Sequence, residues 1–433
     1  MRVLLISENR CRDNLIPYPL GIACIATAAR EAGHEVSGLD LIFSDDPISD
    51  VAQSIGSFQP QCIGLSVRNI DNQDMRDPDF FLPQAKEIVE AIRSVTEAPV
   101  ALGGAGFSIF PLECLEYLGL EMGIVGEGEM CFVNLLERLE GGAGIDDLPG
   151  LALRRDGKGT LNPPGPYLEP ESFPIPDREL FDVTRYSWTP GKMPPYVANL
   201  QARRGCYMRC IYCSTPRIEG TAMRVREAAA VANELACLEQ DYGIPTAFFA
   251  DSLFDYPPDY TKELCREIKQ RELSLKFICS LNPLYTDLEL LELLREAGCT
   301  ALSIGNESGS EDILESLKKG FSREDVIRAI SSAKDLGFAV NCFLLLGGPG
   351  ENESTVKESV ELMTVLEPSA VRVTVGIRIY PGCELTGIAL QEGVISPGQN
   401  ILYPTFYLSR DTESWLHDYM VETCSSRDGW FIT

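Results

Sequence analysis

Two successive series of alternating apolar and helical segments constrain the fold of this chain more than any other feature of its sequence. In the first 140 residues, short apolar runs predict strands at Arg2–Ile6, Glu35–Leu41, Cys62–Val67, Val100–Leu102 and Met122–Val125. Between these runs lie helical patterns, among them Leu20–Ala32, Leu82–Ile92 and Cys131–Leu139. Such alternation is typical of a parallel sheet with helical crossovers. We therefore predict that the chain begins with a doubly wound α/β domain.

The second series occupies most of the remaining chain, from about residue 197 to residue 382. Its apolar runs predict strands at Val197–Ala202, Thr246–Phe249, Lys276–Cys279, Ala301–Ile304, Ala339–Leu345 and Val371–Ile377. Helical patterns fill the gaps, at Arg226–Gln240, Tyr260–Arg271, Asp287–Ala297, Glu311–Lys318 and Arg323–Leu336. This pattern predicts an incomplete (β/α)6 barrel, whose chemistry is expected on the loops that follow the strands.

The segment between the two series has a different composition. Prolines gather between residues 162 and 195, and LALRRDGKGTL predicts a hairpin with its turn at Asp156-Gly157. We therefore expect four regions: a first domain at 1–140, a connector with a hairpin at 141–198, a barrel at 199–385 and a short C-terminal cap at 386–433.

The net charge and the hydropathy exclude several classes of partner. A formal charge of −27 repels phosphate backbones, so nucleic acid is not an expected partner. No apolar run approaches the length of a transmembrane helix, and MRVLLISENR lacks the features of a signal peptide. We therefore expect a cytoplasmic protein, in which the 15 cysteines are free thiols or metal ligands rather than disulfides.

Three of these cysteines are clustered. The stretch RRGCYMRCIYCSTP places Cys206, Cys210 and Cys213 at C-x3-C-x2-C spacing on a loop after a predicted strand. A structural zinc site needs a fourth ligand, and the only histidines are the distant His34 and His417. A cubane iron–sulfur cluster usually takes four thiolates, so three would leave one iron open to a substrate or cofactor.

This motif, with an aromatic residue before its last cysteine, resembles the signature of the radical S-adenosylmethionine (SAM) superfamily. The resemblance implies that Cys206, Cys210 and Cys213 hold a [4Fe-4S] cluster as its metal ligands and catalytic residues. It also implies that SAM binds the open iron and is cleaved reductively to a 5′-deoxyadenosyl radical. An electron donor such as flavodoxin or ferredoxin would then be a partner.

Further segments resemble the loops of that family's barrel. They are FFADSLF, CSLNP, GNESGSEDILESLKKG, GGPGEN and RIYPGCEL, and they follow the cysteines in the family's order. The residues that the resemblance implies as SAM contacts are Tyr212, Asp251, Ser252, Ser280, Asn282, Glu307, Gly348, Arg378 and Tyr380.

The strand-end loops of the first domain are the second candidate site. They read SVRNIDNQ, GGAGFS and GEGE, and no G-x-G-x-x-G follows the first strand, which disfavours a dinucleotide site. The region, with YPLG and AGHEV, resembles the Rossmann-like (flavodoxin-like) cobalamin (B12)-binding domain that precedes the barrel in one radical SAM class. The implied contacts are Ser66, Val67, Arg68, Asn69, Gly103, Gly104, Ala105, Phe107, Ser108, Gly126, Glu127, Gly128 and Glu129.

One feature of many cobalamin domains is missing. The loop SENRCRDNLIPYPLG contains no D-x-H-x-x-G histidine, and we expect His34 to have a capping or core role. Cobalamin would therefore bind without that ligand. Arg68 or Asn69 would face the lower side of the cobalt, and a cationic Arg68 would not ligate it.

The resemblance leaves several functions open. The leading hypothesis is a B12-dependent methyltransferase that acts on an unactivated carbon of a lipid or small natural-product substrate. Cobalamin-assisted radical cyclisation, rearrangement or oxidation is an alternative, and a non-catalytic cobalamin or iron–sulfur sensor is an alternative of another class. A methylthiotransferase is disfavoured, because Cys11 and Cys24 form no second cluster motif and the C-terminus is not basic.

Overall fold

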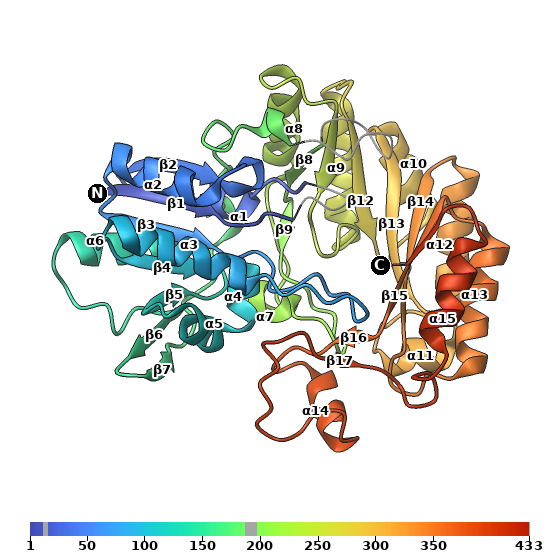
Figure 1. Ribbon diagram of the computed structural model, residues 1–433. Coiled ribbons are helices and arrows are strands. Elements are labelled where there is room, and N and C mark those ends of the chain that lie inside the picture. The colour runs from blue at the N-terminus through green and yellow to red at the C-terminus, as the bar shows by residue number, and fades with distance from the viewer. Residues whose placement is uncertain (12–15, 187–196, 433) are drawn as a thin grey trace. The chain divides into compact units, whose positions relative to one another are not determined.

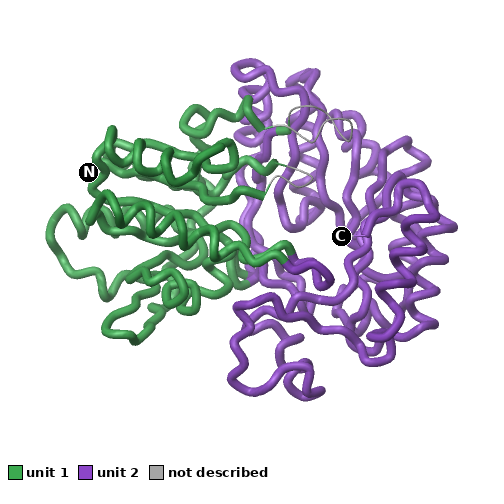
Figure 2. The backbone as a smooth tube through the Cα atoms, viewed as in Figure 1, with its two compact units in different colours: residues 1–72, 79–197, 217–220 green, residues 73–78, 198–216, 221–433 purple. Residues whose placement is uncertain are grey.

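The computed structural model describes residues 1–11, 16–186 and 197–432 (Figure 1). The chain forms two compact units (Figure 2). Unit 1 contains residues 1–72, 79–197 and 217–220, and unit 2 contains residues 73–78, 198–216 and 221–433. Each unit is built around its own large sheet, and the short segment Gln73–Pro78 belongs to unit 2 although the residues that flank it belong to unit 1.

The sheet of unit 1 has seven strands in the order β2-β1-β3-β4-β5-β6-β7. These strands are β1 Arg2–Ser7, β2 Glu35–Asp40, β3 Cys62–Ser66, β4 Val100–Gly103, β5 Met122–Ile124, β6 Leu151–Arg155 and β7 Lys158–Leu161. The pairs among β1 to β5 are parallel. The strand order reverses between β1 and β3, which makes this the switch point at which doubly wound sheets bind ligands.

The predicted hairpin belongs to this sheet. β6 pairs antiparallel with β5, and β7 pairs antiparallel with β6. The apolar side chains of Leu151 and Leu153 are buried, so β6 extends the hydrophobic core of the first domain. This corrects the expectation that the hairpin lies in a connector outside the core, while the four domain boundaries stay a prediction.

The helices of unit 1 cover its sheet in two rows. They are α1 Leu20–Glu31, α2 Pro47–Phe58, α3 Leu82–Val95, α4 Ala105–Ile109, α5 Pro111–Leu118 and α6 Glu129–Glu140, with 3-10 turns at Leu41–Phe43, Pro170–Ser172 and Val183–Arg185. α1 packs beside α6, and α2, α3 and α5 form the other row. Helix α2 begins at Pro47, because Asp46 caps it by accepting a hydrogen bond from the Ser49 N–H (3.1 Å) and proline is favoured at the first helical position.

The sheet of unit 2 has the order β18-β15-β14-β13-β12-β11-β8. Its strands are β8 Val197–Leu200, β11 Thr246–Phe249, β12 Lys276–Leu281, β13 Cys299–Glu307, β14 Ala339–Leu346, β15 Ala370–Val375 and β18 Trp430–Ile432. The pairs from β11 through β15 to β18 are parallel. All six predicted strands are present, and β18 adds a seventh from the segment that was expected to form only a cap.

The helices of unit 2 alternate with its strands. They are α8 Ala228–Gln240, α9 Pro258–Gln270, α10 Leu288–Glu296, α11 Glu311–Ser316, α12 Arg323–Asp335, α13 Glu353–Leu366, α14 Glu384–Gln391 and α15 Leu416–Ser425. Of these, α8, α9, α10, α12 and α13 pack beside one another in chain order. Helix α7, Thr215–Glu219, is divided between the two units, because residues 217–220 belong to unit 1. Two small ladders complete the described structure, β9 Arg203–Arg204 with β10 Arg224–Val225 and β16 Ile377–Arg378 with β17 Phe406–Tyr407. None of the helices in the described ranges has the length and apolarity needed to span a bilayer.

Candidate active site and cofactor-binding loops

The three clustered cysteines follow β9 at the start of unit 2. Cys206 is buried, Cys210 and Cys213 are half-buried, and the Cys213 N–H donates to the Cys210 carbonyl oxygen at 3.2 Å. Among residues 1–11, 16–186 and 197–432, no three Cys, His, Asp or Glu side chains are close enough together to hold a metal ion. The assignment of Cys206, Cys210 and Cys213 as cluster ligands therefore stays a prediction from their spacing.

Asp251 fixes the segment that leads into the cysteine loop. Its Oδ1 accepts hydrogen bonds from the backbone N–H groups of Ala202 (2.9 Å) and Arg203 (2.8 Å). Asp251 is itself buried just after β11. One carboxylate oxygen of this predicted SAM contact is thus engaged in positioning the loop, whereas the neighbouring Ser252 is exposed.

The middle of the cysteine loop is held between two helix ends. The Ile211 N–H donates to the Leu317 carbonyl (3.3 Å), and the Leu385 N–H donates to the Ile211 carbonyl (2.9 Å). The Ile211 side chain lies in a buried apolar cluster that includes Leu317 and Leu385. In addition, the Cys383 thiol donates to the Cys213 carbonyl at 3.4 Å. Both backbone hydrogen bonds and side-chain contacts therefore hold the cysteine loop in place.

A buried charge network adjoins the loop. The Tyr212 hydroxyl donates to Glu307 Oε1 at 3.1 Å, and the Lys319 ammonium lies 3.2 Å from the same oxygen. Lys319 Nζ also donates to the Tyr212 hydroxyl oxygen at 3.1 Å. Sequence reasoning selected Tyr212 and Glu307, and the structure brings them together. It did not select Lys319, since nothing in ESLKKG distinguishes this lysine from Lys318.

The electrostatics of this network reflect its burial. Burial raises the pKa of the Cys210 thiol, and the Lys319 ammonium opposes that shift. Burial also lowers the pKa of Lys319, but Glu307 and the nearby cysteines outweigh it, so the net shift of that pKa is upward. The pKa of Tyr212 lies well above its ordinary value, first because of burial and then because of Glu307. Lys319 is thus charged and Tyr212 is protonated at neutral pH.

Three tyrosines from different segments form an aromatic cluster at the carboxyl ends of the strands. Ring centroids are 4.6 Å apart for Tyr207 and Tyr256, and 5.0 Å apart for Tyr256 and Tyr285. The hydroxyl groups of Tyr207 and Tyr285 share a short hydrogen bond. Tyr207 lies between Cys206 and Cys210, so this cluster borders the cysteine loop. Only the tertiary structure reveals it, because the three residues share no sequence motif.

The other predicted SAM contacts have different surroundings. Asn282 Oδ1 accepts from the Leu284 N–H (2.9 Å), so this side chain caps a turn, while Ser280 is half-buried. The Gly348 N–H donates to Glu351 Oε2 at 2.9 Å. These two interactions stabilise the loops after β12 and β14. A direct contact of Ser280, Asn282 or Gly348 with SAM stays a prediction.

Arg378 binds backbone carbonyl oxygens of its own region. Its guanidinium donates to the carbonyl oxygens of Ile379 (2.8 Å), Ile401 (3.1 Å) and Leu402 (3.0 Å). It is 4% exposed and stacks near the Tyr380 ring. These contacts tie the segment before β17 to β16, which contains Arg378, and a contact of Arg378 with SAM stays a prediction. Tyr380 is half-buried, and its contact with SAM stays a prediction.

Buried carboxyl groups occur in both units. Burial raises the pKa of Asp255, which follows β11, to about 7, although the Asn282 N–H donates to its Oδ2 at 2.8 Å. Burial likewise raises the pKa of Glu8 to about 8. Glu8 directly follows β1, beside the switch point of the first sheet. Neither carboxyl group belongs to a motif, so the sequence alone did not identify them.

The glycine-rich loops of unit 1 meet at one edge of its sheet, as predicted. The Val67 N–H donates to the Gly103 carbonyl (2.8 Å), and the Gly106 N–H donates to the Arg68 carbonyl (2.9 Å). Ser108 links two loops, because its hydroxyl donates to the Gly104 carbonyl (2.9 Å) and accepts from the Gly126 N–H (2.9 Å). This edge thus joins the ends of β3, β4 and β5.

Side chains at this edge divide into exposed and structural groups. Arg68 and Ala105 are exposed, and Ser66, Asn69, Gly103, Gly104, Gly126 and Gly128 are partly exposed, so all of these stay candidates for a cobalamin site. The other predicted contacts pack or bond within the protein. The side chains of Val67, Phe107, Ser108 and Glu129 are buried. Glu127 accepts a hydrogen bond from the Leu168 N–H at 3.2 Å. The Phe107 ring packs against Gly123 within the core, and a contact of Phe107 with cobalamin stays a prediction.

Neither histidine lies on these loops. His34 Nδ1 is 3.1 Å from the Met1 amino group, and burial lowers the pKa of this histidine. His417 lies at the start of α15 in unit 2. The structure thus places no histidine on the loop ends of the first sheet within the described ranges.

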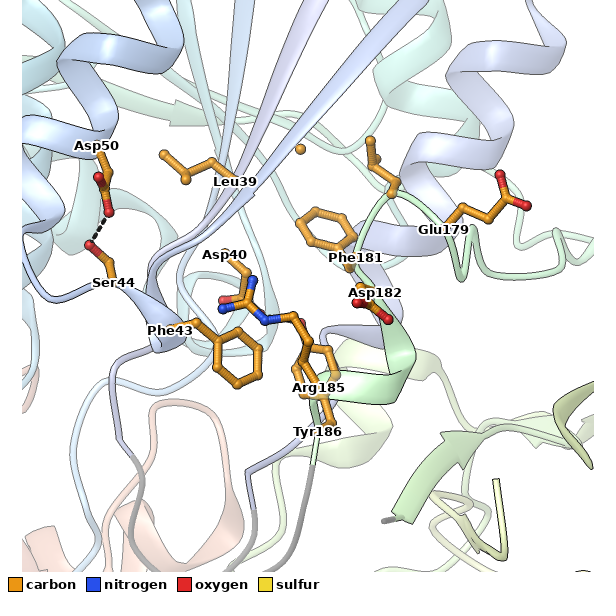
Figure 3. A pocket seen from close by; sticks show the side chains of 12 residues that line it. Leu39, Asp40, Phe43, Ser44, Asp50, Glu179, Phe181, Asp182, Arg185 and Tyr186 are labelled. Atoms are coloured by element: carbon orange, nitrogen blue, oxygen red, sulfur yellow. Dashed lines mark hydrogen bonds between the residues drawn. The ribbon is translucent and has the colours of Figure 1, made fainter. Parts of the chain in front are cut away.

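A cavity of about 300 Å³ opens at the carboxyl end of β2, away from these loops (Figure 3). Its lining includes Asp40, Phe43, Asp50, Arg185 and Tyr186. Tyr186 donates to Asp40, and the Arg185 guanidinium lies 4.1 Å from the Phe43 ring centroid. Two of the polar groups in the lining, Asp40 and Tyr186, are thus engaged with each other.

Comparison with known families identifies both units. Residues 201–363 match the Radical SAM superfamily, and residues 14–136 match the B12 binding domain. Residues 201–363 therefore form a radical SAM domain, and residues 14–136 form a B12-binding domain. The cysteine motif lies inside the first match, and the loops of the parallel sheet in unit 1 lie inside the second. The α/β fold predicted for both parts is confirmed.

Several known proteins are similar to this chain over most of its length. Tryptophan 2-C-methyltransferase of Streptomyces laurentii is 27% identical over 440 residues, covering 88% of this chain and 73% of that protein. An anaerobic magnesium-protoporphyrin IX monomethyl ester cyclase of Rubrivivax gelatinosus is 26% identical, covering 79% and 61%. A solved structure is also similar: that of the radical SAM methyltransferase TsrM of Kitasatospora setae, with tryptophan and a SAM analog bound. The two chains are 25% identical, and they superpose with a TM-score of 0.85 over 99% of this chain and 89% of TsrM.

Proposed function

We propose that this protein is a cobalamin-dependent radical SAM enzyme that methylates an unactivated carbon of a lipid or a small natural product. The observation that carries the proposal is the presence, in one chain, of the cysteine motif within a radical SAM match and of a B12-binding match. Relatives with this organisation include a methyltransferase that acts on a carbon of tryptophan.

The residues of unit 2 fit an iron–sulfur cluster and SAM. The three thiols of the motif lie on one loop, which hydrogen bonds of Ile211 with Leu317 and Leu385 hold in place. When bound, the cluster and SAM would supply one-electron reduction and a carbon radical. The chain would hold the cluster through Cys206, Cys210 and Cys213, and Glu307 would present a carboxylate to SAM. An external donor of the flavodoxin or ferredoxin class would supply the electron.

The residues of unit 1 fit cobalamin in a form without a histidine ligand from the protein. Gly103 has open space where a side chain would lie, because no atom of the described residues beyond its chain neighbours comes within 4 Å of the position that a Cβ would take. Arg68 is exposed on the adjacent loop, and Asn69 lies beside it. In this proposal the backbone of the β4 loop would approach the cofactor closely, and Arg68 would contact it without acting as a metal ligand.

A second function also has support. The match to a magnesium-protoporphyrin cyclase favours cobalamin-assisted cyclisation, rearrangement or oxidation without methyl transfer. The two functions differ in their by-products: methyl transfer from SAM yields S-adenosylhomocysteine, whereas a purely radical outcome yields only 5′-deoxyadenosine. A non-catalytic sensor would yield neither. The net charge of −27 disfavours nucleic acid as a substrate for each of these alternatives.

The test is an anaerobic reconstitution of the full chain with iron, sulfide and hydroxocobalamin. Metal content is measured first, and SAM, dithionite and either a lipid or a small-molecule extract are then added. We expect about four irons and one cobalt per chain, with 5′-deoxyadenosine and S-adenosylhomocysteine both formed. Replacement of Cys206 by Ala should abolish 5′-deoxyadenosine formation. Four irons without cobalt would refute the methyltransferase proposal, and cobalt with 5′-deoxyadenosine alone would favour the second function.

A further inference from the structure

Lys319 is a buried cation beside the cysteine loop that the function proposed above does not yet use. Its side chain is 9% exposed, and that of its partner Glu307 is 15% exposed. The ammonium lies 5.6 Å from the ring centroids of both Tyr212 and Phe321. Keeping an ammonium group in such surroundings costs free energy, which a carboxylate partner and aromatic faces offset only in part. A lysine in this position therefore calls for a reason beyond packing.

The backbone couples Lys319 to the cysteine loop. The Lys319 N–H donates to the Leu314 carbonyl (3.0 Å) in the last turn of α11, and Leu317 in the same turn accepts from the Ile211 N–H (3.3 Å). Ile211 lies between Cys210 and Tyr212. Gly320, with φ of +72°, then turns the chain away. One hydrogen-bonded turn thus sets the position of the ammonium relative to the thiols.

Glu307 has an unusual backbone conformation at the other side of the network. It adopts φ of +59°, in the left-handed region, where a residue with a side chain is strained. The register between β13 and β14 shifts between Ile304 and Glu307. The bonds from Lys319 and Tyr212 hold the carboxylate at this irregular strand end. Of the two contacts that this network makes with the Glu307 carboxylate, only the hydrogen bond from the Tyr212 hydroxyl would remain if Lys319 were lost.

We propose that Lys319 is a positioning residue that orients Glu307 and offsets the negative charge of the thiolates of Cys210 and Cys213, and thereby makes the iron–sulfur cluster easier to reduce. This inference rests on the proposed function, because it needs a cluster on the three cysteines. One electron passes from the external donor to the cluster, which becomes more negative by one charge. A fixed cation in a buried site stabilises that reduced form more than the oxidised form.

A purely structural role makes different predictions. If Lys319 only paired with Glu307 to stabilise the fold, loss of either residue would lower stability, and neither loss would change the reduction of the cluster. A charge effect predicts opposite shifts instead. Removing the cation should disfavour the reduced cluster, and removing the carboxylate should favour it.

The experiment is an anaerobic redox titration of the reconstituted full chain, followed by the low-temperature electron paramagnetic resonance signal of the reduced cluster. The variants are Lys319→Met, Lys319→Arg and Glu307→Gln. Lys318→Met is the matched control, because this neighbouring lysine is 50% exposed and pairs with the equally exposed Glu384. At the potential at which the natural protein is half reduced, we expect the ratio of reduced to oxidised cluster to fall at least tenfold in Lys319→Met, which for one electron equals about 59 mV.

The other variants complete the test. We expect Lys319→Arg and Lys318→Met to stay within about twofold of the natural ratio, and Glu307→Gln to raise it. Equal ratios in Lys319→Met and the natural protein would overturn the inference. If Lys319→Met takes up no cluster, Glu307→Gln decides: a raised ratio supports the charge effect, and an unchanged ratio overturns it. Absence of a cluster from the natural chain after reconstitution would instead refute the proposed function.

Discussion

Replacement of Glu351 by Gln should remove a pH dependence from the stability of unit 2. Glu351 is fully buried, and its Oε2 accepts hydrogen bonds from the N–H groups of Gly347 and Gly348. Its Oε1 has no hydrogen-bond partner within the part of the chain that the structure describes. A glutamine keeps an oxygen that can accept from both N–H groups but carries no charge. The variant therefore isolates the cost of ionising a buried carboxyl group.

The sign and the size of the effect follow from the pKa. Burial raises the pKa of Glu351 from 4.5 to about 7, while the two N–H donors oppose this shift. Between these values the folded protein holds a proton that the unfolded chain has lost, so stability is highest below pH 4.5 and falls as the pH rises to 7. Each pH unit costs about 1.4 kcal/mol, which gives a total of about 3 kcal/mol.

The assay is urea unfolding of the full chain, followed by circular dichroism at a series of pH values from 5 to 8. Other buried carboxyl groups, such as Asp255 and Glu8, titrate in both proteins and cancel in the comparison. We expect the natural protein to lose about 2 to 3 kcal/mol relative to Glu351→Gln across this range. Parallel stability curves for the two proteins would show that the carboxyl group ionises normally and would refute the reasoning.

Two further predictions concern packing in each unit. Gly104→Ala should destabilise the cofactor-free protein by more than about 1 kcal/mol in thermal or urea unfolding. The reason is that Gly104 has a φ of +99° and that a Cβ there would lie 2.4 Å from the Val67 carbonyl oxygen. Gly103→Ala is the control and should leave the stability unchanged, because the space around a Cβ at that position is open. Equal stability of the two variants would contradict this. Arg226→Met should cost about 3 to 5 kcal/mol, because it leaves Glu234 buried without the guanidinium 2.6 Å away, and Arg226→Met/Glu234→Leu should recover most of that loss. A double variant no more stable than the single one would show that the charge pair is not the cause.

Sequence patterns located the parallel strands because each is an apolar run between helical segments. The observed β1, at Arg2–Ser7, and β14, at Ala339–Leu346, differ from their predicted ranges by one residue at their carboxyl ends. The pattern failed where pairing partners are distant or the run is short. β18 has three residues, and its place beside β15 depends on a contact between Val371 and Trp430, which no local pattern encodes.

The two candidate sites were predictable to different degrees. Spacing alone selected Cys206, Cys210 and Cys213, because metal ligands on one loop must be close in sequence. Spacing could not show that Phe107 points into the core or that Arg378 binds backbone carbonyls, because side-chain direction depends on what packs around each loop. Glycine-rich loops have the same sequence character whether they face a ligand or the protein.

By itself, the sequence determined the order of the elements, the parallel pairing of the strands that alternate with helices and the identity of the chemical groups on the strand ends. These properties follow from local periodicity and residue chemistry. Only the tertiary structure decided which of those groups meet: Lys319 with Glu307 and Tyr212, the tyrosines Tyr207, Tyr256 and Tyr285 with one another, and Asp251 with the start of the cysteine loop. The physical reason is that burial and charge pairing depend on residues far apart in the chain, whereas helix and strand formation depend mainly on neighbours.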